Sequence, residues 1–132
     1  MAKTFPVLLL ALLLSLAAVS CAGEELPPLE GKPAELAEAF FQCLVNGHYE
    51  ECTGYFSKEM KRALPAWKLK QAWNELQNQA GQFVKKAEMR EDKIEGYDVV
   101  FVTAEFEHDL VNIRIVFDDD RRVAGLWIEP IH

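Results

Sequence analysis

Apolar residues recur at helical spacing between residues 33 and 81, and they alternate with polar residues from residue 82 to the end of the chain. The first pattern is typical of amphipathic helices and the second of half-buried strands. Asn46-Gly47, Ser57 and Pro65 divide the helical part, because such residues commonly end or begin helices. We therefore predict helical segments at 33–45, 48–56, 58–64 and 65–80.

Turn-forming residues divide the alternating part into four predicted strands, of which the first runs from about Phe83 to Glu91. A two-residue turn at His108-Asp109 would place Phe106 opposite Val111 in the central hairpin. The side of the sheet that faces the helices is then apolar throughout: Phe83, Ala87, Met89, Val100, Val102, Ala104, Phe106, Val111, Ile113, Ile115, Phe117, Ala124, Leu126 and Ile128. The chain thus predicts an α+β fold, with N-terminal helices packed on a four-stranded antiparallel sheet.

The N-terminus has the pattern of a secretory signal peptide, with Lys3 followed by a Leu-rich centre and small residues. Its end, Ala-Ala-Val-Ser-Cys, resembles a bacterial lipobox, although Ala stands where Leu is more usual. We expect residues 1–20 to be removed and Cys21 to carry the lipid as the new N-terminus. Ordinary cleavage after Ala22, an uncleaved membrane span and a chance cysteine are the alternatives.

Residues 22–32 are rich in Glu and Pro, so we predict a flexible tether there and a single domain over 33–132. The chain has a formal net charge of −7, which argues against nucleic acid as a partner and against charge-driven adhesion to anionic lipid. The expected membrane link is therefore the lipid on Cys21. We predict an extracytoplasmic, lipid-anchored protein at a cell membrane or outer membrane, with a secreted soluble protein as the alternative.

Three stretches resemble a known family: LVNGHYE at residues 44–50, YFSKEMK at 55–61 and VAGLWIEP at 123–130. Over about Ala34 to Pro130 the chain is similar to the domain of unknown function 3887 family, within the nuclear transport factor 2-like superfamily. The resemblance implies a cone, in which the helices fill the concave face of a curved sheet. It also implies an exported protein with an accessory or binding role, and relatives of this shape often dimerise through the outer side of the sheet.

The predicted helix-facing side of the sheet holds no acid, base or nucleophile, so proton transfer there lacks a catalytic group. The chain also lacks a nucleophile elbow, a phosphate loop and a dinucleotide fingerprint. We expect a non-catalytic protein without a cofactor. The alternatives are an enzyme at the mouth of the cone, lined by Tyr49, Tyr55, Trp67 and Trp73, and a carrier of a small apolar ligand.

No metal site is expected, because the three histidines are far apart in the sequence. Asp118-Asp119-Asp120 lacks the alternating spacing of a calcium loop and is better explained as a polar turn between the last two strands.

Cys43 and Cys52 lie on the apolar sides of consecutive predicted helices. In an exported protein such a pair invites a disulfide, which would add about 3 kcal/mol if its geometry is unstrained. Two buried free thiols that act as apolar filler are an equal alternative.

The other side of the predicted sheet mixes apolar and charged residues, and a Glu105–Arg114 diagonal pair is expected on it. The candidate interface consists of Phe101, Val116, Val123, Trp127, Glu105, Asn112 and Arg114. An aromatic patch rimmed by charge is typical of protein interfaces. A homodimer is the first interpretation, another envelope protein the second, and cover by the chain's own termini the third.

Overall fold

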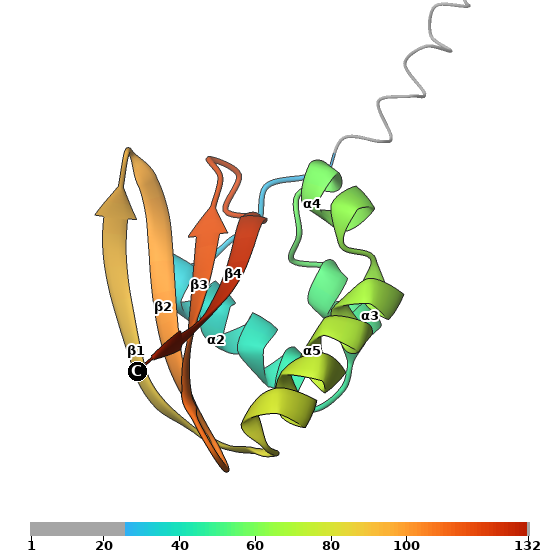
Figure 1. The fold of residues 1–132 in the computed structure, drawn as a ribbon. Helices are drawn as coiled ribbons and strands as arrows, with labels where there is room; N and C mark the ends of the chain where they lie inside the picture. Colours follow the sequence, from blue (N-terminus) through green and yellow to red (C-terminus); the bar gives the residue numbers. More distant parts are fainter. Residues whose placement is uncertain (1–25, 132) are drawn as a thin grey trace, which may run out of the picture.

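The computed structural model describes residues 26–131, in which helices are followed by an antiparallel sheet (Figure 1). The elements are α2 Pro33–Val45, α3 Tyr49–Thr53, α4 Lys58–Ala63, α5 Ala66–Ala80, β1 Phe83–Ile94, β2 Tyr97–Phe106, β3 Leu110–Phe117 and β4 Val123–Ile131. The predicted α+β class is confirmed. The predicted signal peptide, Cys21 and residues 22–25 of the predicted tether lie outside the described residues.

The helices begin and end where local sequence dictates. Pro33 opens α2, and the helix ends at Asn46, after which Gly47 takes a φ of +78°. The Ser57 hydroxyl caps α4 by accepting the Met60 N–H at 3.1 Å. Helix α3 is shorter than predicted, because the chain leaves it at Gly54 so that Phe56 can form a parallel bridge with Val123.

The strands are ordered β1-β2-β3-β4, each antiparallel to the next. One side of this sheet packs against the helices and forms the core (Figure 1). Its large, fully buried side chains are Phe40, Phe41, Phe56, Phe117, Leu44, Ile113, Ile115, Val100, Val102, Val111 and Val123. The apolar faces predicted for α2 and for the central hairpin are therefore confirmed.

The central hairpin turns one residue earlier than predicted, at Glu107-His108. The Phe106 N–H donates to the Asp109 carbonyl at 2.9 Å, so Val111 lies opposite Ala104 and not opposite Phe106. The turn is held there by the preceding connection, because the N–H groups of Glu107 and His108 donate to carbonyls of Gln82 and Ala80. Moving the turn by one residue changes the pairing by two, which leaves every side chain on its predicted side.

At three positions, bulges place the side chain on the opposite side of the sheet from the predicted one. Two irregularities in β1 place Lys86 opposite Ala104 on the helix-facing side and leave Ala87 exposed. A third irregularity, in the β3–β4 pairing, places Val123 opposite Phe117 in the core and leaves Ala124 exposed. Strict alternation fails where one strand carries an extra residue, so the predicted sides of Ala87, Ala124 and Val123 are wrong.

Residues 26–31, which belong to the predicted tether, are hydrogen-bonded to the domain. Arg122 is only 7 % exposed, and its Nε donates to the Pro27 carbonyl at 2.9 Å. The Leu29 N–H donates to the Asp120 carbonyl at 2.9 Å, and Arg121 donates to the Gly31 carbonyl. The turn between β3 and β4 therefore holds the N-terminal segment in place.

Replacing Arg122 by Met should lower the free energy of unfolding by about 1–3 kcal/mol, because buried carbonyls would lose their donor. Its Nη1 donates to the carbonyls of Gly54 and Phe56 as well, at 3.0 and 3.2 Å. Urea unfolding would measure the change, with Arg62→Met as the control at an exposed arginine outside this contact. If the two variants unfolded at the same urea concentration, a central role for Arg122 would be contradicted.

Candidate functional site

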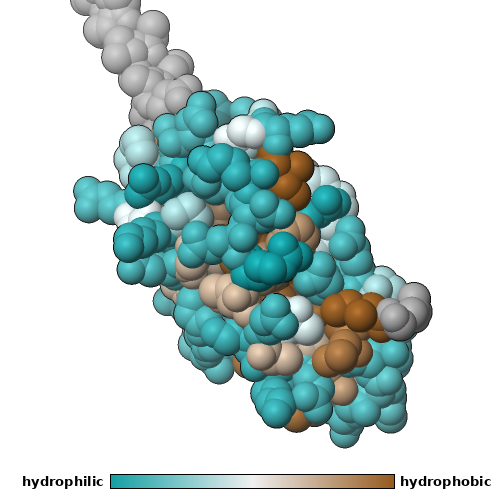
Figure 2. Space-filling model, turned by 90° about the vertical axis from the view of Figure 1, so that its left-hand side faces the viewer, coloured by the Kyte–Doolittle hydropathy of each residue, from teal (hydrophilic) through white to brown (hydrophobic). Residues whose placement is uncertain are grey.

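The side of the sheet that faces away from the helices, called here the outer face, carries most of the predicted interface. Pairing along β2, β3 and β4 places six of the seven predicted residues on it: Phe101, Glu105, Asn112, Arg114, Val116 and Trp127. Val123 is the exception, since it is fully buried in the core. Figure 2 views the molecule from the left of Figure 1, where brown and tan apolar patches interrupt a largely hydrophilic surface.

A groove crosses one end of the outer face, with a volume of about 350 Å³. It is lined by Ile94, Glu95, Tyr97, Val99, Arg114, Val116 and Trp127. Val99 is only 2 % exposed although it faces outward, whereas Tyr97 and Trp127 are about half exposed. A buried floor between exposed aromatic side chains gives this outer-face groove the character of a protein-binding surface.

Arg114 is the charged centre of the groove. Its guanidinium lies 4.7 Å from the centroid of the Trp127 ring, and its Nη2 is 3.5 Å from Glu129 Oε2. The Nε atom is buried and has no hydrogen-bond partner among the described residues. An unsatisfied buried donor is costly, so an acceptor brought by a partner would be stabilised here.

The predicted Glu105–Arg114 pair does not form. Because the hairpin pairing differs by two residues from the predicted one, Arg114 lies opposite Phe101, and Glu105 lies opposite Leu110. Arg114 approaches Glu129 on β4 instead, while Glu105 lies 3.9 Å from Lys85 on β1. The outer face therefore carries both charge signs at several places.

Gly125 makes room for the Trp127 ring. A Cβ atom at this position would lie 2.4 Å from the ring, which is far inside van der Waals contact. Glycine within a strand often marks such a close approach, and this was a signal that the sequence offered. Ile94 was missed because the predicted first strand stopped at Glu91, whereas β1 continues to Ile94. Tyr97 and Val99 belong to β2 and were left out of the predicted interface, although the alternation of Val99 with the buried Val100 was a signal for its outward side.

A second hollow, called here the apolar cavity, lies on the helix-facing side of the sheet. It has a volume of about 230 Å³ and is lined by Leu44, Leu64, Leu69, Ala72, Trp73, Ile113, Leu126 and Ile128. Of the aromatic residues predicted for a mouth, Trp73 lines it, whereas Trp67 is 63 % exposed on the first turn of α5. No titratable side chain is among the lining residues.

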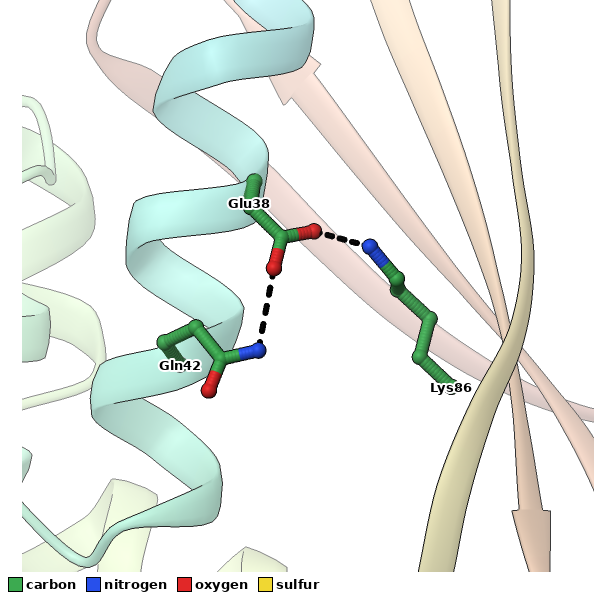
Figure 3. A network of polar contacts seen from close by, with 3 residues as sticks. All are labelled: Glu38, Gln42 and Lys86. Carbon is green, nitrogen blue, oxygen red and sulfur yellow. Dashed lines mark hydrogen bonds and ion pairs between the residues drawn. The ribbon is translucent and has the colours of Figure 1, made fainter.

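One ion pair joins α2 to the edge strand β1 (Figure 3). The Lys86 ammonium pairs with one Glu38 oxygen, and the other oxygen accepts the Gln42 side-chain N–H at 2.9 Å. Lys86 thereby holds the pKa of the Glu38 carboxyl below its usual value. The helix-facing side does contain an ionisable pair, contrary to the sequence expectation, but a carboxylate held ionised is a weak base.

Cys43 and Cys52 are brought together as free thiols. Cys52 is buried, and its thiol is 4.0 Å from the Phe40 carbonyl oxygen. Burial, together with the neighbouring Cys43, raises the pKa of the Cys52 thiol to about 12, and burial also raises the pKa of Cys43. This placement is compatible with a disulfide and also with two free thiols that fill apolar space. The disulfide therefore stays a prediction.

Within residues 26–131, no group of three or more His, Cys, Asp or Glu side chains is arranged to hold a metal ion. The Asp118 carboxylate instead accepts the N–H groups of Asp120 and Arg122, at 2.9 and 3.0 Å, and so shapes the turn after β3. In the same part of the chain, no helix has the length and apolar character needed to span a bilayer.

A comparison with protein-family models matches residues 37–126 to a family described as "Protein of unknown function (DUF3887)". Comparisons with curated proteins and with solved structures found no match.

Replacing Gly125 by Ala should displace the Trp127 ring and remove its stacking on Arg114. We expect a loss of about 0.5–1 kcal/mol in the free energy of unfolding, which is the range for an exposed cation–π pair. The same replacement in a Trp127→Leu background should cost nothing, because the ring is already absent. Urea unfolding of the unaltered protein, the two single variants and the double variant gives the coupling energy between the two positions. If Gly125→Ala lowered the free energy of unfolding equally with and without Trp127, the stacked geometry would be contradicted.

Proposed function

Because the chain belongs to the DUF3887 family of proteins of unknown function, its role has to be argued from its own surfaces, and we propose that it is a non-catalytic binding module. We infer that it is exported and anchored at a cell membrane or outer membrane by a lipid on Cys21. The observation that carries the binding role is the outer-face groove, where Trp127 and Arg114 stand over a buried apolar floor.

A second copy of the chain is the partner that fits this face best. A two-fold symmetric interface places the same patch on both sides, so each charge must meet its opposite within that patch. The outer face meets this condition, because Arg90, Arg114 and Lys85 alternate with Glu105 and Glu129 across it. Another envelope protein with exposed apolar and acidic groups would satisfy the same chemistry.

Binding is favoured over catalysis by the nature of the apolar cavity. A general acid or base must reach its substrate within hydrogen-bonding distance, and the side chains that line this cavity carry no such group. Glu38 and Lys86 neutralise each other outside the lining. An enzyme that uses the interior of the domain is therefore the less supported alternative.

The anchor is supported by the leader pattern, and the docked segment limits how far the domain could lie from it. If the lipid is on Cys21, only residues 22–25 separate it from Leu26, a separation of at most about 18 Å when fully extended. The contacts of Arg121 and Arg122 with residues 27–31 would then keep the domain close to the bilayer and fix which end faces it.

A second candidate function is the carriage of a small apolar ligand. The apolar cavity favours it, since sheet and helices leave a hollow of about 230 Å³ instead of closing completely. A hollow between helices and a curved sheet is also what membership of the nuclear transport factor 2-like superfamily would provide. We propose that the chain belongs to this superfamily, because its helices precede a four-stranded antiparallel sheet.

The anchor can be tested by intact mass of protein recovered from membranes of a bacterial host. A chain that begins at Cys21 and carries added acyl mass is expected, and the Cys21→Ser variant should lose both the acyl mass and the membrane fraction. An unacylated soluble chain in both cases would refute the lipoprotein interpretation and leave a secreted protein.

The interface can be tested by sedimentation velocity of the full chain. Trp127→Glu should convert a dimer to a monomer, because it buries an unpaired charge in the groove. Trp67→Glu is the matched control, since that tryptophan is also exposed but lies on α5. A monomeric unaltered protein would refute the homodimer, and a Trp127→Glu dimer would refute the outer face as its interface.

A further inference from the structure

The two edges of the sheet differ in how they are protected. Strands β1 and β4 are the edge strands, since each has a neighbour on one side only. Seven of the twelve residues of β1 are charged, and charged side chains, lysine above all, keep edge strands from pairing with other chains. Strand β4 carries no charge from Val123 to Ile128, so this edge lacks that protection.

The free edge of β4 is paired only at its first residue. The Val123 N–H donates to the Tyr55 carbonyl at 2.7 Å, and the Val123 carbonyl accepts the Ser57 N–H at 2.9 Å. The chain then turns into α4 and leaves the edge. Beyond Val123, no backbone hydrogen bond joins β4 to any described element other than β3.

Residues 124–129 therefore present unpaired backbone groups. Alternate residues of an antiparallel strand direct their N–H and C=O groups to opposite sides, so about half of these groups point to the free edge. Pro130 has no N–H, which ends the row of donors. The groups that match such a row best are those of another extended backbone.

The apolar cavity lies beside this edge, where β4 faces α5 (Figure 1). Strand β4 supplies Leu126 and Ile128 to the lining, and α5 supplies Trp73. Ile128 is 37 % exposed, and Ala72, which also lines the cavity, is exposed, so the cavity is open to solvent here. Because side chains alternate along a strand, an extended chain beside β4 directs every second side chain toward the cavity.

We propose that the free edge of β4 and the apolar cavity form a strand-addition site, which binds an extended segment of a partner protein with apolar residues at every second position. The backbone of residues 124–129 pairs with the segment and provides affinity, and the cavity selects its apolar side chains. The site goes beyond the outer-face interface and does not depend on it. It also gives the apolar cavity a peptide side chain as its occupant.

The proposal can be tested with two peptides of one composition, acetyl-KTVTLTVTK-amide and acetyl-KTTVLVTTK-amide. The first places its three apolar residues on one side of a strand, and the second does not. Fluorescence anisotropy with the full chain should show the first peptide binding about tenfold more tightly, because it buries at least one more apolar side chain in the cavity.

Backbone pairing can be tested separately with N-methylated versions of the first peptide. One version carries N-methyl groups on its valines and leucine, the other on its threonines. Alternate N–H groups leave a strand on opposite sides, so only one version should lose the bonds to β4. That version should bind about tenfold more weakly, since two or three hydrogen bonds are lost, and the other should bind like the parent peptide.

A variant locates the site on β4. Ile128→Lys should weaken binding of the first peptide about tenfold, because it puts a charge on the unprotected edge beside the cavity. Val84→Lys is the matched control, since Val84 is an exposed apolar residue on the other edge strand. The N-methylated peptides are tested on the unaltered protein, so the proposal stays testable even if Ile128→Lys fails to fold.

Each contrary outcome overturns a stated part of the proposal. Binding of neither peptide would overturn the strand-addition site and leave the outer-face groove unaffected. Equal weakening by both N-methylation patterns, or by neither, would overturn the backbone pairing. If no peptide bound but Ile128→Lys turned a dimer into a monomer in sedimentation velocity, the edge would belong to a second copy of the chain and the peptide partner would be overturned.

Discussion

The structure depends on the removal of a single face of the sheet from water. Val100, Val102, Ile113 and Ile115 are fully buried on that face, and only helices packed against it can cover them. Phe40 and Phe41 of α2 provide this cover. Since the strands alternate, burying one face leaves the other to solvent, and the outer face with its groove is a direct consequence.

Most of the architecture could be read from the sequence, because its periodicity carries the information. The helices, the four strands and their buried faces follow from the spacing of apolar residues and from Asn46, Gly47 and Ser57. The hairpin pairing could not be read, because Glu107 and His108 are fixed by carbonyls of Ala80 and Gln82, which are distant in the chain. The bulges could not be predicted either, since no residue type requires one.

The candidate site was predictable only where it lies on regular strand. Phe101, Arg114 and Trp127 alternate with core residues and were placed correctly, whereas Val123 follows an irregular pairing and was placed on the wrong face. The pairing of Lys86 with Glu38 was missed for the same reason, because a bulge turns that lysine toward α2. Errors in the predicted site thus follow errors in strand regularity.

The two proposed binding surfaces share the backbone of β3 and β4. Arg114 and Trp127 belong to the outer-face groove, and their chain neighbours Ile113 and Ile128 line the apolar cavity. A slip of one residue in β4 would exchange Trp127 with Ile128 and destroy both surfaces at once. The bridge of Phe56 to Val123 holds the start of β4 and so limits such a slip. Because Arg122 binds the carbonyl of Phe56 as well as that of Pro27, the contact that docks the N-terminal segment also steadies the strand that carries both surfaces.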